Sequence, residues 1–273
     1  MPATAIVRHP AVAGRFYPSD PVTLRQQIDS CLAPSLPLPV RAAGCIVPHA
    51  GYVYSGHVAG AVFARLEIPQ LCLVLCPNHT GVGRPLAIMS DGAWETPLGS
   101  VPIDRAFAAA LKQRCPLLQE DSTAHRGEHA AEVELPFLLV RRPDFAFVPI
   151  ALGTGQFEVL AQLGDAIADV IAAEKRQVLI VASSDMNHYE ADAITRMKDA
   201  RAIEPILALD ARALYEVVTQ QHVSMCGFGP AVAMLTAAKQ LGASSAELVK
   251  YATSGEISGD LDTVVGYAGV IVA

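Results

Sequence analysis

The 273-residue sequence is poor in charge and lacks the features that mark membrane spans or nucleic-acid grooves. Only 17% of its residues are charged, the net charge is −7, and Lys and Arg never run for more than two residues. A nucleic-acid groove or an anionic membrane surface requires a concentrated positive field, so both partners are disfavoured. No apolar stretch approaches the length of a membrane span, and the N-terminus has no apolar signal core.

Several common catalytic and metal-binding motifs are also missing. The sequence contains no GxxxxGK[ST], no GxGxxG after a strand, no GxSxG, no paired CxxC and no HExxH. These absences disfavour P-loop and dinucleotide sites, an α/β-hydrolase nucleophile and a zincin peptidase. The six cysteines show no regular framework, which is typical of a reduced protein, so we expect a cytoplasmic location.

What remains is a chain rich in apolar runs. Hydrophobic residues make up 52% of it, enough for a large core, and only the short, rigid stretch at 33–40 resembles a linker. We therefore predict a single domain over 1–273. Val/Ile/Leu runs alternate with helical patterns, which predicts an α/β fold whose mostly parallel or mixed central sheet is covered by helices on both faces. The expected strands are 43–48, 71–76, 145–152, 177–185 and two near the C-terminus; the expected helices are 55–66, 104–114, 128–141, 156–173, 191–208, 210–219 and 230–241.

Three of these strands are each followed by a histidine. His49 follows the first, His79 the second, and His188 the strand over 177–185. In parallel sheets ligands bind beyond the carboxyl ends of the strands, so the three imidazoles are predicted to converge there. A lone histidine at a strand end is more often a structural hydrogen-bonding residue. Three in equivalent places favour a site, because imidazole is both a common metal ligand and a general base.

Two further residues near these ends could take part in chemistry. Asp185 lies three residues before His188, where its carboxylate could orient the ring or cap a following helix. Cys226 lies in a glycine-rich bend before a predicted helix, where the pKa of a thiol is lowered and a thiolate could bind metal or act as a nucleophile. The alternative is a buried cysteine in a tight turn.

The segment "AHRGEHAAEVELPF" (124–137) concentrates two histidines and three glutamates. His129 and Glu132 would share a helix face, as would Glu128 and Glu132. On spacing alone, a solvated helix face is the better interpretation of this segment.

Six ordered motifs resemble those of the Memo family, whose prokaryotic members are called AmmeMemoRadiSam system protein B. The motifs are "AGRFYP" (13–18), "PHAGYVYSG" (48–56), "PNHT" (77–80), "EHAAEVELPF" (128–137), "SSDMNH" (183–188) and "MCGFGP" (225–230). They span nearly the whole chain. The resemblance implies a fold similar to the class III extradiol, LigB-type dioxygenases, which bind non-haem iron with two histidines and a carboxylate.

Carried onto this chain, the resemblance implies roles for eight residues. The metal ligands would be His49, His79 and Cys226; the acid–base residues would be His188 with Asp185; the substrate-binding residues would be Phe16, Tyr54 and His129. A thiolate would then stand where the dioxygenases have a glutamate. Thiolate favours copper and zinc more than a carboxylate does, so we expect iron or copper, with zinc as a further candidate.

Three functions fit these residues. The first is a metal-dependent redox enzyme or oxygenase acting on a small molecule. The second is a non-catalytic protein that binds a metal, a small molecule or a peptide, and the third is a hydrolase using metal-bound water. The family name further suggests radical SAM and AMMECR-type proteins as partners.

Overall fold

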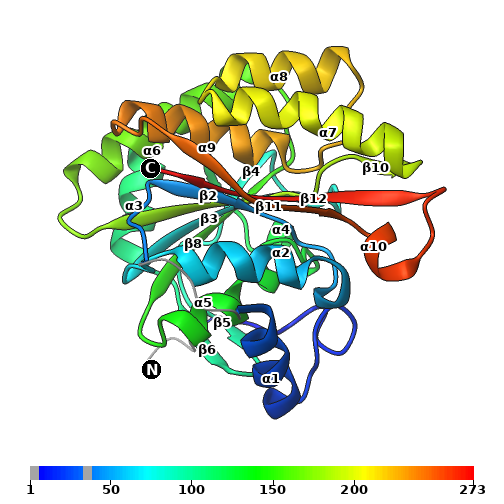
Figure 1. Ribbon diagram of the computed structural model, residues 1–273. Coiled ribbons are helices and arrows are strands. Elements are labelled where there is room, and N and C mark those ends of the chain that lie inside the picture. Colours follow the sequence, from blue (N-terminus) through cyan, green and yellow to red (C-terminus); the bar gives the residue numbers. More distant parts are fainter. Residues whose placement is uncertain (1–5, 33–38) are drawn as a thin grey trace.

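A central sheet runs through the molecule and carries helices on both faces (Figure 1). The computed structural model describes residues 6–32 and 39–273, and nine strands of that part of the chain belong to this sheet. Its main path follows the order β10 (His188–Glu190), β12 (Val264–Val272), β2 (Gly44–Val47), β9 (Val178–Ser183), β3 (Leu71–Pro77), β8 (Ala146–Leu152), β4 (Leu86–Ile88) and β7 (Gln119–Glu120), with β11 (Ala246–Thr253) also pairing β12. The predicted α/β fold with a mixed sheet is confirmed.

The middle of this sheet is parallel, and its flanks are antiparallel. Strands β2, β9, β3 and β8 pair in parallel, whereas β12 and β4 run antiparallel to their neighbours β2 and β8. Every residue of β2, β3 and β9 is buried, which explains their uninterrupted apolar sequences. Because β9 lies between β2 and β3, the carboxyl ends of these three strands are immediate neighbours.

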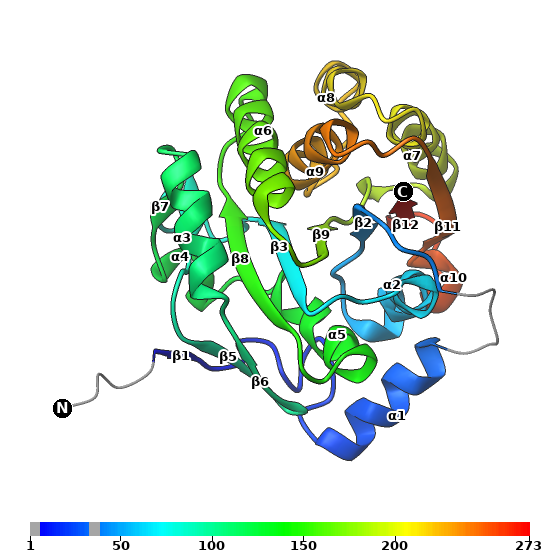
Figure 2. The same ribbon diagram turned by 90° about the vertical axis from the view of Figure 1, so that its left-hand side faces the viewer.

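Helices cover the sheet in two layers (Figure 2). One layer contains α6 (Phe157–Ala173), α7 (Asp192–Leu207), α8 (Ala211–Gln220) and α9 (Phe228–Gln240), and the other contains α1 (Pro21–Leu32), α2 (Tyr52–Arg65) and α5 (Leu135–Arg141). Helix α3 (Arg105–Arg114) packs beside α6, and the short helices α4 (Thr123–Arg126) and α10 (Gly255–Ser258) lie in connecting segments. A smaller sheet of β1 (Val7–Arg8), β5 (Ala93–Thr96) and β6 (Gly99–Pro102) contains the buried Trp94.

The helices differ from the sequence prediction at several points. Helices α1, α4 and α10 were not predicted. Helix α2 begins at Tyr52 rather than at 55, and α9 begins at Phe228 rather than at 230. The helix predicted over 128–141 is wrong in its first part, because 128–131 is a loop and η1 (Glu132–Glu134), a single 3₁₀ turn, precedes α5. Of the stretch at 33–40, residues 33–38 lie outside the described part of the chain.

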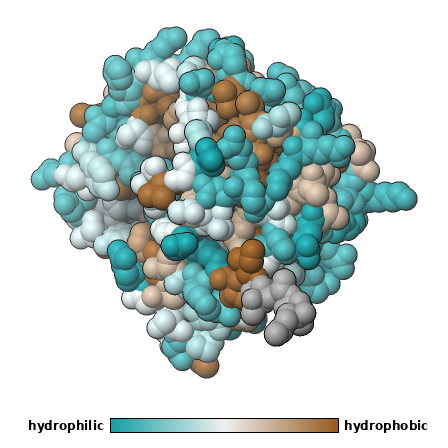
Figure 3. Space-filling model, turned by 180° about the vertical axis from the view of Figure 1, so that it is seen from behind, coloured by the Kyte–Doolittle hydropathy of each residue, from teal (hydrophilic) through white to brown (hydrophobic). Residues whose placement is uncertain are grey.

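The surface combines a polar majority with separate apolar patches. Seen from behind, polar side chains cover most of the molecule, and the apolar ones gather in small areas (Figure 3). Among the described residues, no helix combines the length and apolar character that crossing a membrane would require.

A buried glutamate, Glu132, attaches the N-terminal segment to the rest of the fold. Its carboxylate accepts hydrogen bonds from the backbone N–H groups of Ala11 at 2.8 Å and Val12 at 3.0 Å, and from the Tyr17 hydroxyl at 2.6 Å. It also pairs with the buried guanidinium of Arg8. Burying these charges is tolerable because each finds hydrogen-bonding partners.

We predict that Glu132→Gln lowers the free energy of unfolding by about 3–5 kcal/mol, because it leaves the Arg8 guanidinium buried without an opposite charge. Urea denaturation measures the change. The matched control is Glu67→Gln, which breaks the exposed pair with Arg41 and should cost under about 1 kcal/mol. Equal effects of the two substitutions would contradict the anchoring role of Glu132.

Tyr189 has a strained backbone at the edge of the sheet. Its φ of 60° lies in the left-handed region, and the register between β10 and β12 shifts between His188 and Glu190. An extra residue of this kind re-aims a side chain and is common beside functional sites. The Tyr189 side chain is 76% exposed, so little packing offsets the strain.

We therefore predict that Tyr189→Gly raises the free energy of unfolding by roughly 0.5–1 kcal/mol, since relief of the left-handed conformation outweighs the entropy of glycine. Tyr189→Phe, which keeps the strain, should leave stability unchanged. Thermal and urea denaturation of both variants test this. A loss of stability in Tyr189→Gly would mean that the ring contributes packing that its exposure does not suggest.

Candidate functional site

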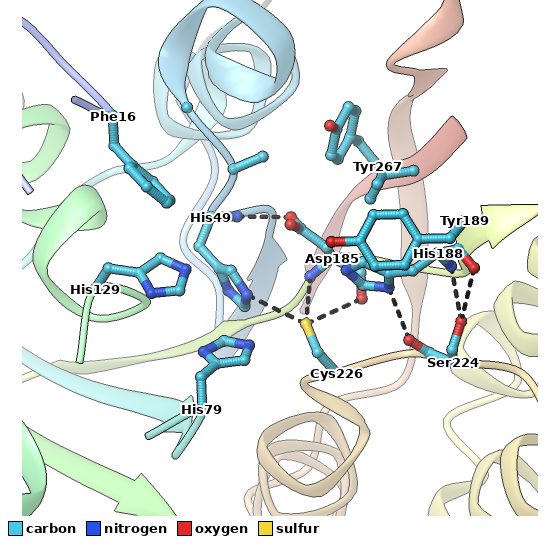
Figure 4. A pocket seen from close by; sticks show the side chains of 13 residues that line it. Phe16, His49, His79, His129, Asp185, His188, Tyr189, Ser224, Cys226 and Tyr267 are labelled. Atoms are coloured by element: carbon cyan, nitrogen blue, oxygen red, sulfur yellow. Dashed lines mark hydrogen bonds between the residues drawn. The ribbon is translucent and has the colours of Figure 1, made fainter. Parts of the chain in front are cut away.

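A pocket of about 590 Å³ opens where the parallel strands end. Its wall includes residues that follow β2, β3 and β9 together with Cys226 from the bend before α9 (Figure 4). His49, His79, His188 and Cys226 all line it, which confirms the prediction that they meet at one end of the sheet. No Lys or Arg is among the lining residues, so the pocket carries no fixed positive charge.

Three imidazoles form the centre of the pocket. His49, His79 and His129 each offer one ring nitrogen, and these atoms lie within 4.8 Å of one another. The ring centroids are 4.8–5.4 Å apart. Burial, followed by repulsion from neighbouring imidazoles, lowers the pKa of His49 and keeps its ring neutral. Neutral imidazole is the form that binds metal, so this group could hold a metal ion.

His129 is the member of this trio that the sequence analysis placed elsewhere. It was assigned to substrate binding and to a helix face, yet it lies in the loop before η1 with its ring directed at the other two. The neighbouring residues Glu128 and His129 do not have a spacing typical of metal ligands. The position of His129 among the other two imidazoles follows from the packing of its loop against the strand ends, which the sequence does not show.

His79 is held by a buried carboxylate, Glu128. One oxygen of Glu128 accepts from the backbone N–H of His79 at 2.6 Å, and the other lies 2.9 Å from Nδ1 of its ring. Burial acts against both charges, but the contact between the two groups raises the pKa of His79 and lowers that of Glu128. With Nδ1 bound to Glu128, Nε2 is the ring nitrogen left for a ligand.

The three glutamates of the segment 128–134 are therefore not on a solvated face. Glu128, Glu132 and Glu134 are all buried, and that interpretation of their spacing is wrong. Each makes hydrogen bonds to residues far away in the sequence: to His79, to the N-terminal segment and to Ser183. A spacing of four residues places side chains on one face of a helix but does not say whether that face meets water.

Cys226 lies beside His49, with Sγ 3.2 Å from Nε2. The backbone N–H of Asp185 donates to Sγ at 3.3 Å. Burial and the nearby Asp185 raise the pKa of this thiol well above its ordinary value, so the predicted lowering by a helix N-terminus is wrong for the metal-free protein. Gly227 permits the approach, because a Cβ there would lie 2.3 Å from the carbonyl oxygen of Ser183.

Asp185 is buried under the pocket, and burial raises its pKa to about 6. It lines the pocket near His188, but among the hydrogen bonds of the described residues it makes none to that ring. Its Oδ1 instead accepts from the backbone N–H of His49 at 2.8 Å. It does not cap a helix either, because strand β10 follows. Both alternatives considered from the sequence are therefore corrected: Asp185 positions the backbone at His49.

His188 lies at the outer part of the pocket. Nδ1 of its ring donates to the carbonyl oxygen of Ser224 at 2.8 Å, and its backbone N–H donates to the Ser224 hydroxyl at 2.7 Å. These two bonds fix the ring orientation and leave Nε2 available in the pocket. Figure 4 shows His188 beside Tyr189 and Tyr267, across from the three central imidazoles.

The aromatic wall differs in part from the prediction. Phe16 lines the pocket with its ring centroid 4.7 Å from that of His129. Tyr54 does not line it: its side chain is 41% exposed on α2, so its predicted role in substrate binding is not supported. Tyr267 and Tyr189 line it instead. Tyr267 lies in a predicted strand, where no local pattern distinguishes a pocket residue, whereas Tyr189 directly follows the motif that ends at His188, which was a signal that it lies near the site.

Comparison with known proteins relates nearly the whole chain to one family. The family model described as Memo-like protein matches residues 8–271. A MEMO1 family protein of Methanopyrus kandleri is 46% identical over 277 residues, covering 97% of this chain and 98% of the relative. A MEMO1 family protein of Methanothermobacter thermautotrophicus is 40% identical over 274 residues, covering 96% and 99%.

A solved structure shows the same fold at much lower identity. The crystal structure of an uncharacterized protein from Escherichia coli K12 aligns with a TM-score of 0.53 and 13% identity, over 85% of this chain and 100% of that one. Likeness at that level concerns the fold alone, whereas the sequence matches extend over nearly the whole chain. The chain therefore belongs to the Memo-like protein family.

Proposed function

We propose that this protein binds a redox-active metal ion at His49, His79 and His129 and uses it in oxygenase or redox chemistry on a small molecule. The observation that carries the proposal is the convergence of the three imidazole nitrogens within 4.8 Å at the end of the sheet. Cys226 is close enough to His49 to complete or modify the ligand set.

The donor set is compatible with several metals. Imidazole nitrogens suit iron, copper and zinc, while a thiolate shifts preference toward copper(I) and zinc. A cation at this position would favour deprotonation of the Cys226 thiol, opposing the effect of burial. When bound, a redox metal would supply electron transfer and an open position for a small molecule. Iron and copper are the proposed ions, and zinc would fit the same ligands without redox chemistry.

The chain's own residues supply binding and proton transfer. Phe16 and Tyr267 form apolar walls that can exclude water from the body of a ligand. His188 presents Nε2 to the pocket and can take or give a proton there, because its other nitrogen is committed to Ser224. This division puts metal binding on one wall and acid–base chemistry on the other.

A second function is supported by a separate observation. The pocket has a sulfur close to the imidazoles where a carboxylate would complete the iron site of the extradiol dioxygenases, and it is open enough to admit a peptide side chain. A non-catalytic protein that binds metal and a small molecule or peptide is therefore the alternative. In this alternative the protein acts with radical SAM and AMMECR-type partners. It does so in the cytoplasm, a reducing compartment that suits its six free cysteines.

Metal binding is tested first by substitution of the ligands. After anaerobic loading, alanine at His49, His79 or His129 should each weaken metal binding by more than the roughly 10–100-fold that loss of a supporting residue costs. Cys226→Ala should weaken copper(I) and zinc more than iron(II). Elemental analysis and chelator competition give stoichiometry and affinity.

Cys72→Ala is the control for this series, because Cys72 is buried in β3 away from the pocket. It should retain full metal content and lose only on the order of 1 kcal/mol of stability. If wild-type protein retains no iron, copper or zinc after loading, the proposed metal site is refuted.

Catalysis is tested separately through His188. His188→Ala should keep its metal and lower turnover by ~100-fold or more, because an acid–base group acts on the transition state. Oxygen uptake and product formation on a panel of phenols and catechols measure turnover beside metal content. His222→Ala, at an exposed position outside the pocket, should behave as wild type. Full metal with no turnover in any protein would favour the binding function.

A further inference from the structure

Glu134 is a buried carboxyl group close to the proposed metal site but not part of the pocket wall. Its side chain is 1% exposed, and it lies in the 3₁₀ turn η1. Its Oε1 is 2.9 Å from the hydroxyl of Ser183. Its Oε2 is buried and has no hydrogen-bond partner in the described part of the chain. An ionised carboxylate in this position would leave half of its charge without any compensation, which is strongly unfavourable in a buried site.

The Ser183 hydroxyl determines which way the hydrogen bonds run. A serine hydroxyl has one proton to give and two lone pairs to receive. Its oxygen has three partners: the carbonyl oxygen of Ala130 at 2.7 Å, Oε1 of Glu134 at 2.9 Å and Nδ1 of His49 at 2.8 Å. A carbonyl oxygen can only accept, so the serine proton goes to Ala130. The two remaining partners must both donate, and Ser183 is then fully satisfied.

We propose that Glu134 is a neutral carboxylic acid that donates its proton to Ser183 and, through Ser183, holds His49 in the tautomer with hydrogen on Nδ1. Nε2 of His49 then carries the lone pair that faces Cys226 and the other imidazoles. Glu134 is a positioning residue. Naming Nε2 as a metal ligand rests on the proposed function; the protonation state and the tautomer do not.

Two imidazoles of the site are thus oriented by opposite kinds of carboxyl group. His79 is held by Glu128, whose pKa is lowered overall by the contact with that ring despite its burial. For Glu134, burial raises the pKa well above the ordinary range, which agrees with the neutral acid that the hydrogen bonds require. A neutral Glu134 avoids a further negative charge close to Asp185. The different charge states of the two carboxyl groups predict different responses to substitution: glutamine can replace the neutral Glu134 but not the charged Glu128.

The direct test uses metal-free full-length protein. Infrared difference spectra of wild type against Glu134→Gln should show the carbonyl stretch of a protonated acid that the variant lacks. Working at about pH 8.5 removes interference from Asp185 and Asp199, whose pKa values are about 6 and about 7. Nitrogen-15 NMR of the His49 ring should show hydrogen on Nδ1 in wild type and in Glu134→Gln. Absence of the acid band, or hydrogen on Nε2 in wild type, would overturn the proposal.

The second test measures Zn²⁺ affinity by chelator competition. Glu134→Gln should match wild type, because an amide N–H donates to Ser183 as the acid does. Ser183→Ala and Glu134→Leu should weaken binding by about 10–100-fold, as should the control Glu128→Gln, which removes a needed charge. If Glu134→Gln bound Zn²⁺ as weakly as Glu128→Gln does, a neutral Glu134 would be contradicted.

The design keeps the two proposals separable. If wild type binds no Zn²⁺ and also retains no iron or copper, the proposed metal site fails, while the infrared and NMR results on metal-free protein still decide the state of Glu134 and of His49. If Glu134→Leu does not fold, the Zn²⁺ affinity of Ser183→Ala is compared with that of wild type instead, since this variant removes the hydroxyl that joins Glu134 to His49.

Discussion

Buried carboxyl groups of one short segment hold the pocket in place. The glutamates at 128, 132 and 134 each make hydrogen bonds to a different part of the chain: the histidine after β3, the N-terminal segment that carries Phe16, and the serine at the end of β9. These contacts link residues about 50 to 120 positions apart. A buried polar group must find partners, so each glutamate restricts how the surrounding elements can pack. The position of the imidazoles depends on this restriction.

The electrostatics of the pocket follow from the same burial. No lysine or arginine lines it, and burial favours the neutral forms of His49, of the Cys226 thiol and of Glu134. Glu128 differs from these groups, because its direct contact with His79 favours its charged form. The three imidazoles could bind a metal ion, and in the proposed function a cation bound there would favour the thiolate form of Cys226. Metal binding would then be accompanied by release of a proton.

The two sides of the pocket explain why both proposed functions remain consistent with one geometry. The imidazoles on one side can bind an ion, while His188, Tyr189 and Tyr267 on the other can contact a ligand without touching that ion. An enzyme and a binding protein need the same first step, a ligand held against a metal. They differ in whether His188 transfers a proton, which is a property of the reaction rather than of the arrangement.

The sequence alone determined the alternation of buried strands and helices, because apolar periodicity is a local property, and it predicted the sheet edge at which His49, His79 and His188 meet. Cys226 was placed beside them by the resemblance of its motif to the Memo family. The tertiary structure alone decided the burial of the three glutamates, the placement of His129 among the metal-capable imidazoles, and the loss of Tyr54 from the pocket. Residue spacing reports which side chains share a face, but not what that face packs against. Hydrogen-bond partners, tautomers and pKa shifts arise between residues distant in the chain, so they exist only once the chain has folded.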